Sequence, residues 1–309
     1  MQKIKVAVVG AGHLGSIHAK LYQEIDTCSL VGVSDIDKAR LDQVSSSLNV
    51  PGYLNYQELF GKVDAVSIAV PTKLHFPVTA DFLKHKIHTL VEKPFTTNLK
   101  EADSLIKLAA KLRLILQVGH VERFNSAFSA TLKLIKDPKF IECHRLSPFP
   151  NRSLDIGAVL DLMIHDIDIV LGLVNSPIKK IEAIGVPVLT HLEDIANARI
   201  TFKNGCVCNL TASRVSDEWM RKIRIFLKNT YISLDYKNEE AFVYRKTDSG
   251  ITKETLPIEK EQPLKKELAS FLDCVIQNKP PIVSGEVARQ ALKVAFDISN
   301  QIWKKPRTF

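Results

Sequence analysis

Two separate groups of residues in this sequence carry side chains that could move a proton. Glu92-Lys93-Pro94 follows a short apolar run. A lysine there could hydrogen-bond a hydroxyl oxygen and stabilise the negative charge that develops on it. Asp161, His165 and Asp168 are spaced i, i+4 and i+7, which predicts one stripe on a helix. The unperturbed pKa of an imidazole is near neutrality, so His165 is a natural general base.

The same residue types leave other interpretations open. Taken alone, Lys93 fits a solvated surface lysine. His165 fits a core imidazole paired with Asp161, and two carboxylates with an imidazole could hold a metal ion. The polar stripe is bordered by an apolar one, made of Leu160, Ile164, Ile167 and Leu171. Polar groups on such a largely buried helix must be satisfied or functional.

A glycine-rich turn follows the first predicted strand. The residues from Gly10 to Gly15 read G-x-G-x-x-G between a strand at 4–9 and a helix at 13–25, a context typical of dinucleotide binding. Gly10 permits the tight turn, Gly12 lets the backbone approach a pyrophosphate, and Gly15 allows close packing of the helix on the strand. We expect these glycines, His13 and Leu14 to contact the cofactor at the helix N-terminus.

The second predicted strand ends at Asp35, 20 residues after Gly15. A carboxylate there accepts hydrogen bonds from ribose hydroxyls and repels a 2′-phosphate, so the sequence favours NAD over NADP. Later parallel strands end on the same ligand crevice. The cofactor contacts expected there are Val70, Pro71, Thr72, His75, Glu92 and Lys93.

Positioning these residues requires two domains. Over residues 1–120, apolar runs at 4–9, 28–34, 64–70, 87–91 and 114–118 alternate with helical patterns. Such alternation predicts an α/β Rossmann domain with a parallel sheet covered on both faces. Residues 121–309 predict an α+β domain around a mainly antiparallel open sheet, with helices at 122–135, 159–173, 262–278 and 285–303. We expect the last helix to be able to pack back on the first domain.

Composition narrows the class of protein further. The net charge of +8 has no dense basic run, which argues against a dedicated nucleic-acid binder. No stretch approaches the ~18 apolar residues of a membrane span, and the first strand begins too early for a signal peptide. Five cysteines without a Cys-x-x-Cys pair fit a reducing cytoplasm and small buried side chains.

The glycine pattern, Glu92-Lys93-Pro94 and Asp161-x-x-x-His165 together resemble the Gfo/Idh/MocA oxidoreductase superfamily, along the whole chain. The resemblance implies that Lys93, Asp161 and His165 surround the carbon that loses hydride to NAD, and it leaves little room for a metal site. Residues 119–125 and 148–168 are similar to the UDP-N-acetylglucosamine 3-dehydrogenase-like branch. Ser126 departs from that branch, where proline is expected.

The resemblance implies a mechanism and a substrate class. His165 takes the hydroxyl proton, Lys93 hydrogen-bonds the oxygen and Asp161 orients His165 or a neighbouring hydroxyl; whether Lys93 or His165 is the base stays open. A UDP sugar needs positive partners for its diphosphate, which bidentate arginine suits. The expected substrate contacts beyond the three catalytic residues are Arg123, Asn125, Arg152 and Arg214. The alternative for these arginines is a solvated surface.

Two rival functions remain at this point. The same scaffold could oxidise an inositol or a simple sugar, and a Rossmann-type regulator could sense NAD(P) without catalysis. The regulator would not need the polar stripe at 161–168. We expect a homodimer or homotetramer, because relatives pair through the open face of the second sheet.

Overall fold

The chain forms two compact units, and a computed structural model describes residues 3–149 and 155–304 of it. The first unit consists of residues 1–121 with 262–289, and the second of residues 122–261 with 290–309. Residues 262–289, which we expected in the second domain, therefore group with the first unit.

The first unit is built on a six-stranded sheet in the order β3-β2-β1-β4-β5-β6, with every neighbouring pair parallel. This is the strand order of a Rossmann fold, whose ligand crevice lies where the order reverses, between β1 and β4. The strands are β1 (Ile4–Val9), β2 (Cys28–Ser34), β3 (Gly52–Tyr53), β4 (Ala65–Ile68), β5 (His88–Glu92) and β6 (Leu116–Gly119). The predicted parallel sheet is confirmed.

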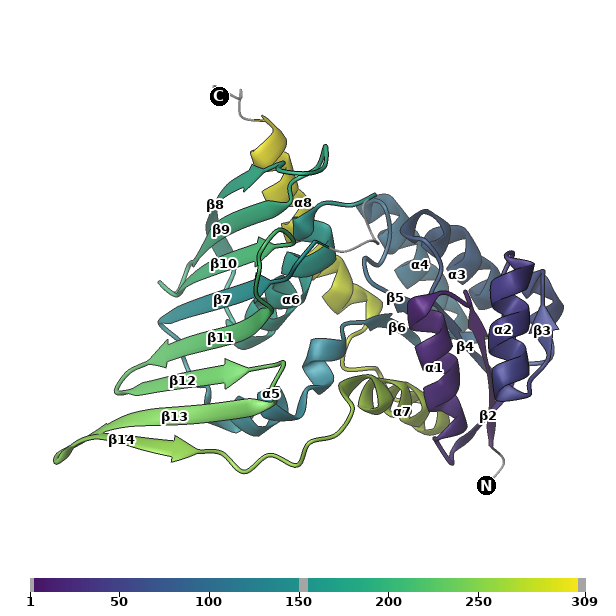
Figure 1. The fold of residues 1–309 in the computed structure, drawn as a ribbon, viewed down its shortest axis with the longest axis horizontal. Helices are drawn as coiled ribbons and strands as arrows, with labels where there is room; N and C mark the ends of the chain where they lie inside the picture. The colour runs from purple at the N-terminus through teal and green to yellow at the C-terminus, as the bar shows by residue number, and fades with distance from the viewer. Residues whose placement is uncertain (1–2, 150–154, 305–309) are drawn as a thin grey trace. The chain divides into compact units, whose positions relative to one another are not determined.

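The helices of the first unit fall into two packed groups (Figure 1). Helix α1 (His13–Gln23) contacts α2 (Lys38–Leu48) and α7 (Pro263–Gln277), whereas α3 (His75–Lys84) contacts α4 (Leu99–Leu112). Leu268, Phe271 and Leu272 of α7 are fully buried and share a core cluster with Tyr22 of α1. This apolar stripe explains why residues 262–289 group with the first unit.

The second unit is built on an eight-stranded sheet in the order β14-β13-β12-β11-β7-β10-β9-β8. All pairs are antiparallel except β7 with β10, so the prediction of a mainly antiparallel sheet is confirmed. The strands are β7 (Phe140–Leu146), β8 (Ile178–Val186), β9 (Ile195–Phe202), β10 (Val207–Ser213), β11 (Met220–Leu227), β12 (Thr230–Asp235), β13 (Glu240–Thr247) and β14 (Gly250–Thr255).

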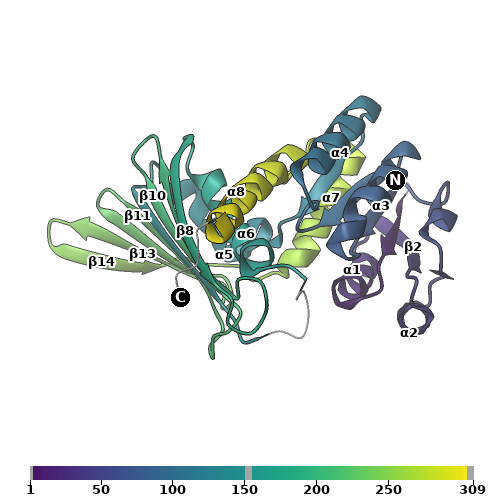
Figure 2. The same cartoon turned by 90° about the horizontal axis from the view of Figure 1, so that it is seen from above.

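One face of this second sheet is covered by helices and the other is open. Figure 2 shows α5 (Ser126–Thr131), α6 (Ile164–Leu173) and the C-terminal part of α8 (Gly285–Lys304) on the same face. Burial alternates along β7 and β10 as a half-covered sheet requires. Every second residue is therefore available to line the open face.

Local sequence signals explain several element boundaries. The Asn98 side chain accepts from the Glu101 backbone N–H and begins α4, and the Glu101 side chain accepts from the backbone N–H of Thr97. Asn204-Gly205 turns the chain between β9 and β10, with Gly205 at φ +87°. The expected helix at 122–135 is broken into a short 3₁₀ segment, α5 and a second 3₁₀ turn. No helix within the described ranges is long and apolar enough to cross a membrane.

Candidate active site

The glycine-rich turn between β1 and α1 can take only glycine at two of its positions. Gly10 has φ +99°, and a Cβ there would lie 2.4 Å from the carbonyl oxygen of Ala69. A Cβ at Gly15 would lie 1.7 Å from the carbonyl oxygen of Gly10, so helix and turn touch backbone to backbone. A Cβ at Gly12 meets nothing within 4 Å. The turn thus leaves open space beside the first N–H groups of α1, as a bound pyrophosphate requires.

The other predicted contacts at this turn lie beside it. His13 and Leu14 begin α1 and are exposed. Asp35 follows β2, and its Oδ2 accepts from the Ala11 N–H at 2.6 Å while Oδ1 accepts from the Asp37 N–H at 2.8 Å. The carboxylate is therefore fixed against the turn at the point where a ribose would lie.

His75 joins the loops that follow β4 and β5. Its Nδ1 lies 2.8 Å from the carbonyl oxygen of Pro94, and its Nε2 lies 2.9 Å from that of Val70. Burial lowers the pKa of His75, although both carbonyls oppose that shift. Val70, Pro71 and Thr72 retain exposed surface, so His75 acts behind the predicted cofactor loop rather than at its surface.

Glu92 ends β5 and its carboxylate is buried, and Lys93 follows it. Glu92 Oε1 lies 3.1 Å from Nε2 of His18, and Oε2 accepts from the Lys93 N–H at 3.3 Å. A Cβ at Gly119 would lie 2.8 Å from Oε1, so the neighbouring strand makes room for the carboxylate. Burial by itself raises the pKa of Glu92, but the hydrogen bond from His18 and the nearby basic groups hold it below its usual value.

His18 is a buried residue of this region that we did not predict from sequence. It lies on the inward face of α1, three residues after Gly15, and has no exposed surface. A histidine at that spacing, in the first turns of a dinucleotide helix, is a signal that could have singled it out. Its partner, 74 positions away, could not have been read from spacing.

In the second unit, Asp161 and His165 lie at the start of the predicted helix. Residues Val159–Met163 form a π-helical turn that leads into α6, a feature often found at functional sites. Asp161 and His165 are half-buried, whereas Asp166 and Asp168 are buried. Asp161 and His165 therefore remain the predicted stripe members with exposed surface.

Arg145 of β7 neutralises a buried pair of carboxylates beneath α6. Its Nη2 and Nε donate to Asp166 at 2.9 and 3.0 Å, and its Nη1 donates to Glu122 at 2.7 Å. Burial raises the pKa of Asp166 despite this pairing, and the two carboxylates raise the pKa of Arg145. The network holds α6 on the sheet immediately beside His165.

The arginines predicted to bind a diphosphate are placed differently from one another. Arg214, where we expected a substrate contact, has no exposed surface and donates to Asp194, Thr190 and the carbonyl of Ile156, so its guanidinium is used inside the fold. Arg152 lies outside the described residues.

Arg123 and Asn125 are likewise engaged within the second unit. Arg123 makes a two-pronged contact with Asp168, at 2.5 and 3.0 Å, and its side chain is 14% exposed. Asn125 caps α5 by accepting from two backbone N–H groups and donates to the carbonyl of Tyr236. Both residues therefore have structural partners where we expected substrate contacts.

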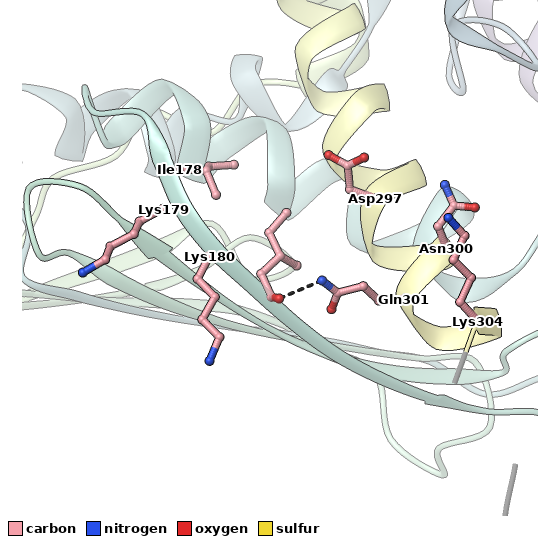
Figure 3. A pocket seen from close by; sticks show the side chains of 8 residues that line it. Ile178, Lys179, Lys180, Asp297, Asn300, Gln301 and Lys304 are labelled. Atoms are coloured by element: carbon pink, nitrogen blue, oxygen red, sulfur yellow. Dashed lines mark hydrogen bonds between the residues drawn. The ribbon is translucent and has the colours of Figure 1, made fainter. Parts of the chain in front are cut away.

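A surface pocket of about 410 Å³ lies between β8 and α8 (Figure 3). Lys179 and Lys180 come from the strand, and Gln301 of α8 donates to the carbonyl of Ile181. None of the predicted site residues lines it. Among the described residues, no group of three or more His, Cys, Asp or Glu side chains could hold a metal ion.

Comparisons with known proteins agree with the two-domain architecture and the dinucleotide-binding turn. Residues 4–120 match the family described as an oxidoreductase family with an NAD-binding Rossmann fold, and residues 120–232 match the GFO/IDH/MocA C-terminal domain. The sequence is 35% identical over 305 residues to UDP-N-acetylglucosamine 3-dehydrogenase of Acidithiobacillus ferrooxidans, covering 96% of this chain and 97% of that protein. A solved structure of that dehydrogenase superimposes with a TM-score of 0.93, 36% identity and 98% of each chain covered.

A second relative acts on a different class of substrate. Myo-inositol 2-dehydrogenase of Thermotoga maritima is 27% identical, covering 98% of this chain and 97% of that protein. The likeness extends along both units in each case.

Replacing Arg145 by methionine is expected to lower the free energy of unfolding by about 3–5 kcal/mol, because Glu122 and Asp166 lose their buried partner. The loss should be larger near pH 7 than near pH 5, since the orphaned carboxyls hold protons that the unfolded chain releases. Urea unfolding of the full chain measures it. The control is Arg224→Met, which removes the ion pair between the half-exposed Arg224 and Glu142 and should lower the free energy of unfolding by less than about 1 kcal/mol. Equal losses would contradict the structural role of Arg145.

Proposed function

Because this chain belongs to the GFO/IDH/MocA oxidoreductase family, we propose that it is an NAD-dependent dehydrogenase that oxidises C3 of a UDP-N-acetylhexosamine to a ketone. The similarity to UDP-N-acetylglucosamine 3-dehydrogenase along nearly the whole chain carries this proposal. An inositol or simple sugar is the second candidate, favoured by the likeness to myo-inositol 2-dehydrogenase.

The first unit is an NAD-binding Rossmann fold, and its residues fit the cofactor. The open space at Gly12 and the N-terminus of α1 would hold the pyrophosphate, and the fixed carboxylate of Asp35 would hold the ribose hydroxyls. When bound, NAD supplies the acceptor for the hydride that leaves the sugar carbon.

The protein's own residues handle the proton of the reaction. We assign His165 as the base that takes the hydroxyl proton as the carbon loses hydride, and Lys93 as the donor that stabilises the oxygen. Asp161 orients His165 or a neighbouring hydroxyl. The exposed surface that Asp161 and His165 keep, beside the buried and paired Asp166 and Asp168, supports this choice.

The site of the substrate diphosphate is a proposal of its own. Arg152 is the candidate left from sequence after Arg214, and it lies outside the described residues. Arg123 would have to exchange its contact with Asp168 for a phosphate. We therefore favour Arg152 over Arg123 for this role.

The open face of the second sheet supports the proposal of a homodimer or homotetramer. Phe140, Phe226, Tyr231 and Tyr244 lie directly opposite one another on β7, β11, β12 and β13. Their ring centroids are 5.6, 4.7 and 5.0 Å apart along this row. An aromatic row on an uncovered sheet face is typical of an interface. The five buried, free cysteines fit our proposal of a cytoplasmic protein.

Absorbance of NADH should rise when the protein receives NAD and UDP-N-acetylglucosamine, with an acceptor that removes the keto product. His165→Asn should lower kcat about 100-fold or more while NADH binding persists. His144→Asn, a half-buried histidine on β7, is the matched control and should keep its activity. Turnover only with myo-inositol or glucose would move the proposal to the second candidate. NAD binding without turnover on any of them would favour a sensing role.

Asp35→Asn should raise the affinity for NADPH relative to NADH about tenfold, because the negative charge that repels a 2′-phosphate is removed. Titration of both reduced cofactors by fluorescence measures the ratio. Asp37→Asn removes a neighbouring charge that caps α2 and should leave the ratio unchanged. An equal ratio in wild type and Asp35→Asn would overturn the assignment.

Phe226→Glu should shift the protein toward the monomer in native mass spectrometry, since it places a charge in the middle of the aromatic row. Leu54→Glu changes a half-exposed apolar residue of the first unit and should not alter the assembly. A monomeric wild-type protein at micromolar concentration would refute the proposed assembly.

A further inference from the structure

The helical segment that carries Asp161 and His165 begins without a capping side chain of its own. Ala158 occupies its N-cap position and has no polar atom that could accept from the first N–H groups of the helix. Ala158 and Val159 have no exposed surface, so water cannot take the place of a cap. The start of the segment therefore needs acceptors from elsewhere in the fold.

Glu193, two residues before β9, supplies these acceptors. It is 2% exposed and lies 34 positions after Val159. Its carbonyl oxygen accepts from the Ala158 N–H at 2.8 Å, and its Oε1 accepts from the Val159 N–H at 3.4 Å. A Cβ at Gly157 would lie 2.1 Å from Oε1, so glycine leaves the space that the carboxylate fills. The main chain and the side chain of Glu193 together cap the segment.

The second carboxylate oxygen of Glu193 is held by the last turn of α8. Trp303 Nε1 donates to Oε2 at 3.0 Å, and the C-terminal part of α8 covers the same sheet face as α6 (Figure 2). One carboxylate thus accepts from two different elements, which a glutamine with a single acceptor oxygen could not do. A negative charge at the start of a helical segment is also favoured by the helix dipole.

The residue next to Glu193 holds the chain just before the helix. Asp194 Oδ1 accepts from Arg214 Nε at 2.8 Å, and Arg214 Nη1 donates to the carbonyl of Ile156 at 2.8 Å. On the other side, the Asp161 N–H donates to the carbonyl of Gly157 at 3.0 Å. The held stretch 156–159 is therefore hydrogen-bonded directly to the first residue of the predicted catalytic pair.

We propose that Glu193 is a positioning residue for the predicted base: it caps the helical segment from outside, and Trp303 fixes its carboxylate in the orientation that does so. That Asp161 and His165 act on a sugar rests on the proposed function, whereas the contacts that cap the segment do not. Asp161 lies inside the π-helical turn and His165 about one turn after it. A shift at the start of the segment would therefore move both side chains.

Hydrogen exchange of the full-length protein, read by mass spectrometry, tests the cap without any substrate. Glu193→Gln should speed exchange of backbone amides in peptides covering residues 157–165 about tenfold, because one acceptor oxygen cannot serve both donors. Trp303→Phe removes the indole N–H and should speed exchange of the same peptides by a smaller factor. Trp219→Phe is the matched control: this half-exposed tryptophan faces the guanidinium of Arg221, and its replacement should leave those peptides unchanged.

Steady-state kinetics in two backgrounds tests the link to His165. In the wild-type background, Glu193→Gln should lower kcat about tenfold with the KM for NAD unchanged, because the imidazole is no longer held against the hydroxyl. In the His165→Asn background the same substitution should change kcat less than about twofold, since the residue that it positions is already gone. A general loss of stability would lower kcat by the same factor in both backgrounds.

The outcomes separate this inference from the proposed function. Unchanged exchange at residues 157–165 in folded Glu193→Gln, or an equal loss of kcat in both backgrounds, overturns the inference. If Glu193→Gln does not fold, Trp303→Phe keeps an aromatic ring at the site and gives both tests. Faster exchange at residues 157–165 in a protein that oxidises no sugar would support the cap and refute the dehydrogenase assignment.

Discussion

Charge that is withdrawn from water must be paired, and both units obey this constraint beside the residues assigned to the chemistry. In the first unit, the Glu92 carboxylate is held by His18 beneath the turn that presents Lys93. In the second, Arg145 neutralises Asp166 immediately beside His165. Each pair is nearly inaccessible to solvent, so removing one partner leaves an isolated buried charge. The strand and helix ends that carry the reactive groups are thereby held in one arrangement.

Local pattern was sufficient to predict the sheets and the cofactor turn. Apolar runs of about the observed lengths predicted the parallel strands. At Gly10 and Gly15 the backbone approaches so closely that any side chain would clash, which explains why the pattern has glycine there. The two-residue strand β3 and the exposed strand β14 were missed. Neither carries a buried apolar run, because β3 is too short and β14 is exposed along its whole length.

Residue type was a poor guide to the arginines, for a physical reason. Arg123 and Arg214 have the same chemistry that suits a phosphate, but each meets an aspartate of its own unit, Asp168 and Asp194. Those contacts join residues 45 and 20 positions apart. Spacing on a helix or strand predicts near neighbours only, so the partner of a buried charge emerges only from the folded chain. For the same reason, the contact between His18 and Glu92 could not be predicted from the sequence.

The distribution of charge also bears on our proposal that His165 is the base. Lys93 and His165 could each accept a proton when neutral, and sequence does not choose between them. The Glu92 carboxylate precedes Lys93 and accepts from its backbone N–H, which fits the proposed role of Lys93 as a hydrogen-bond donor to the substrate oxygen. Near His165, by contrast, the carboxylates of Asp166 and Asp168 are paired with Arg145 and Arg123. Of the aspartates on this helical segment, Asp161 alone retains exposed surface, which fits its proposed role of orienting the imidazole of His165.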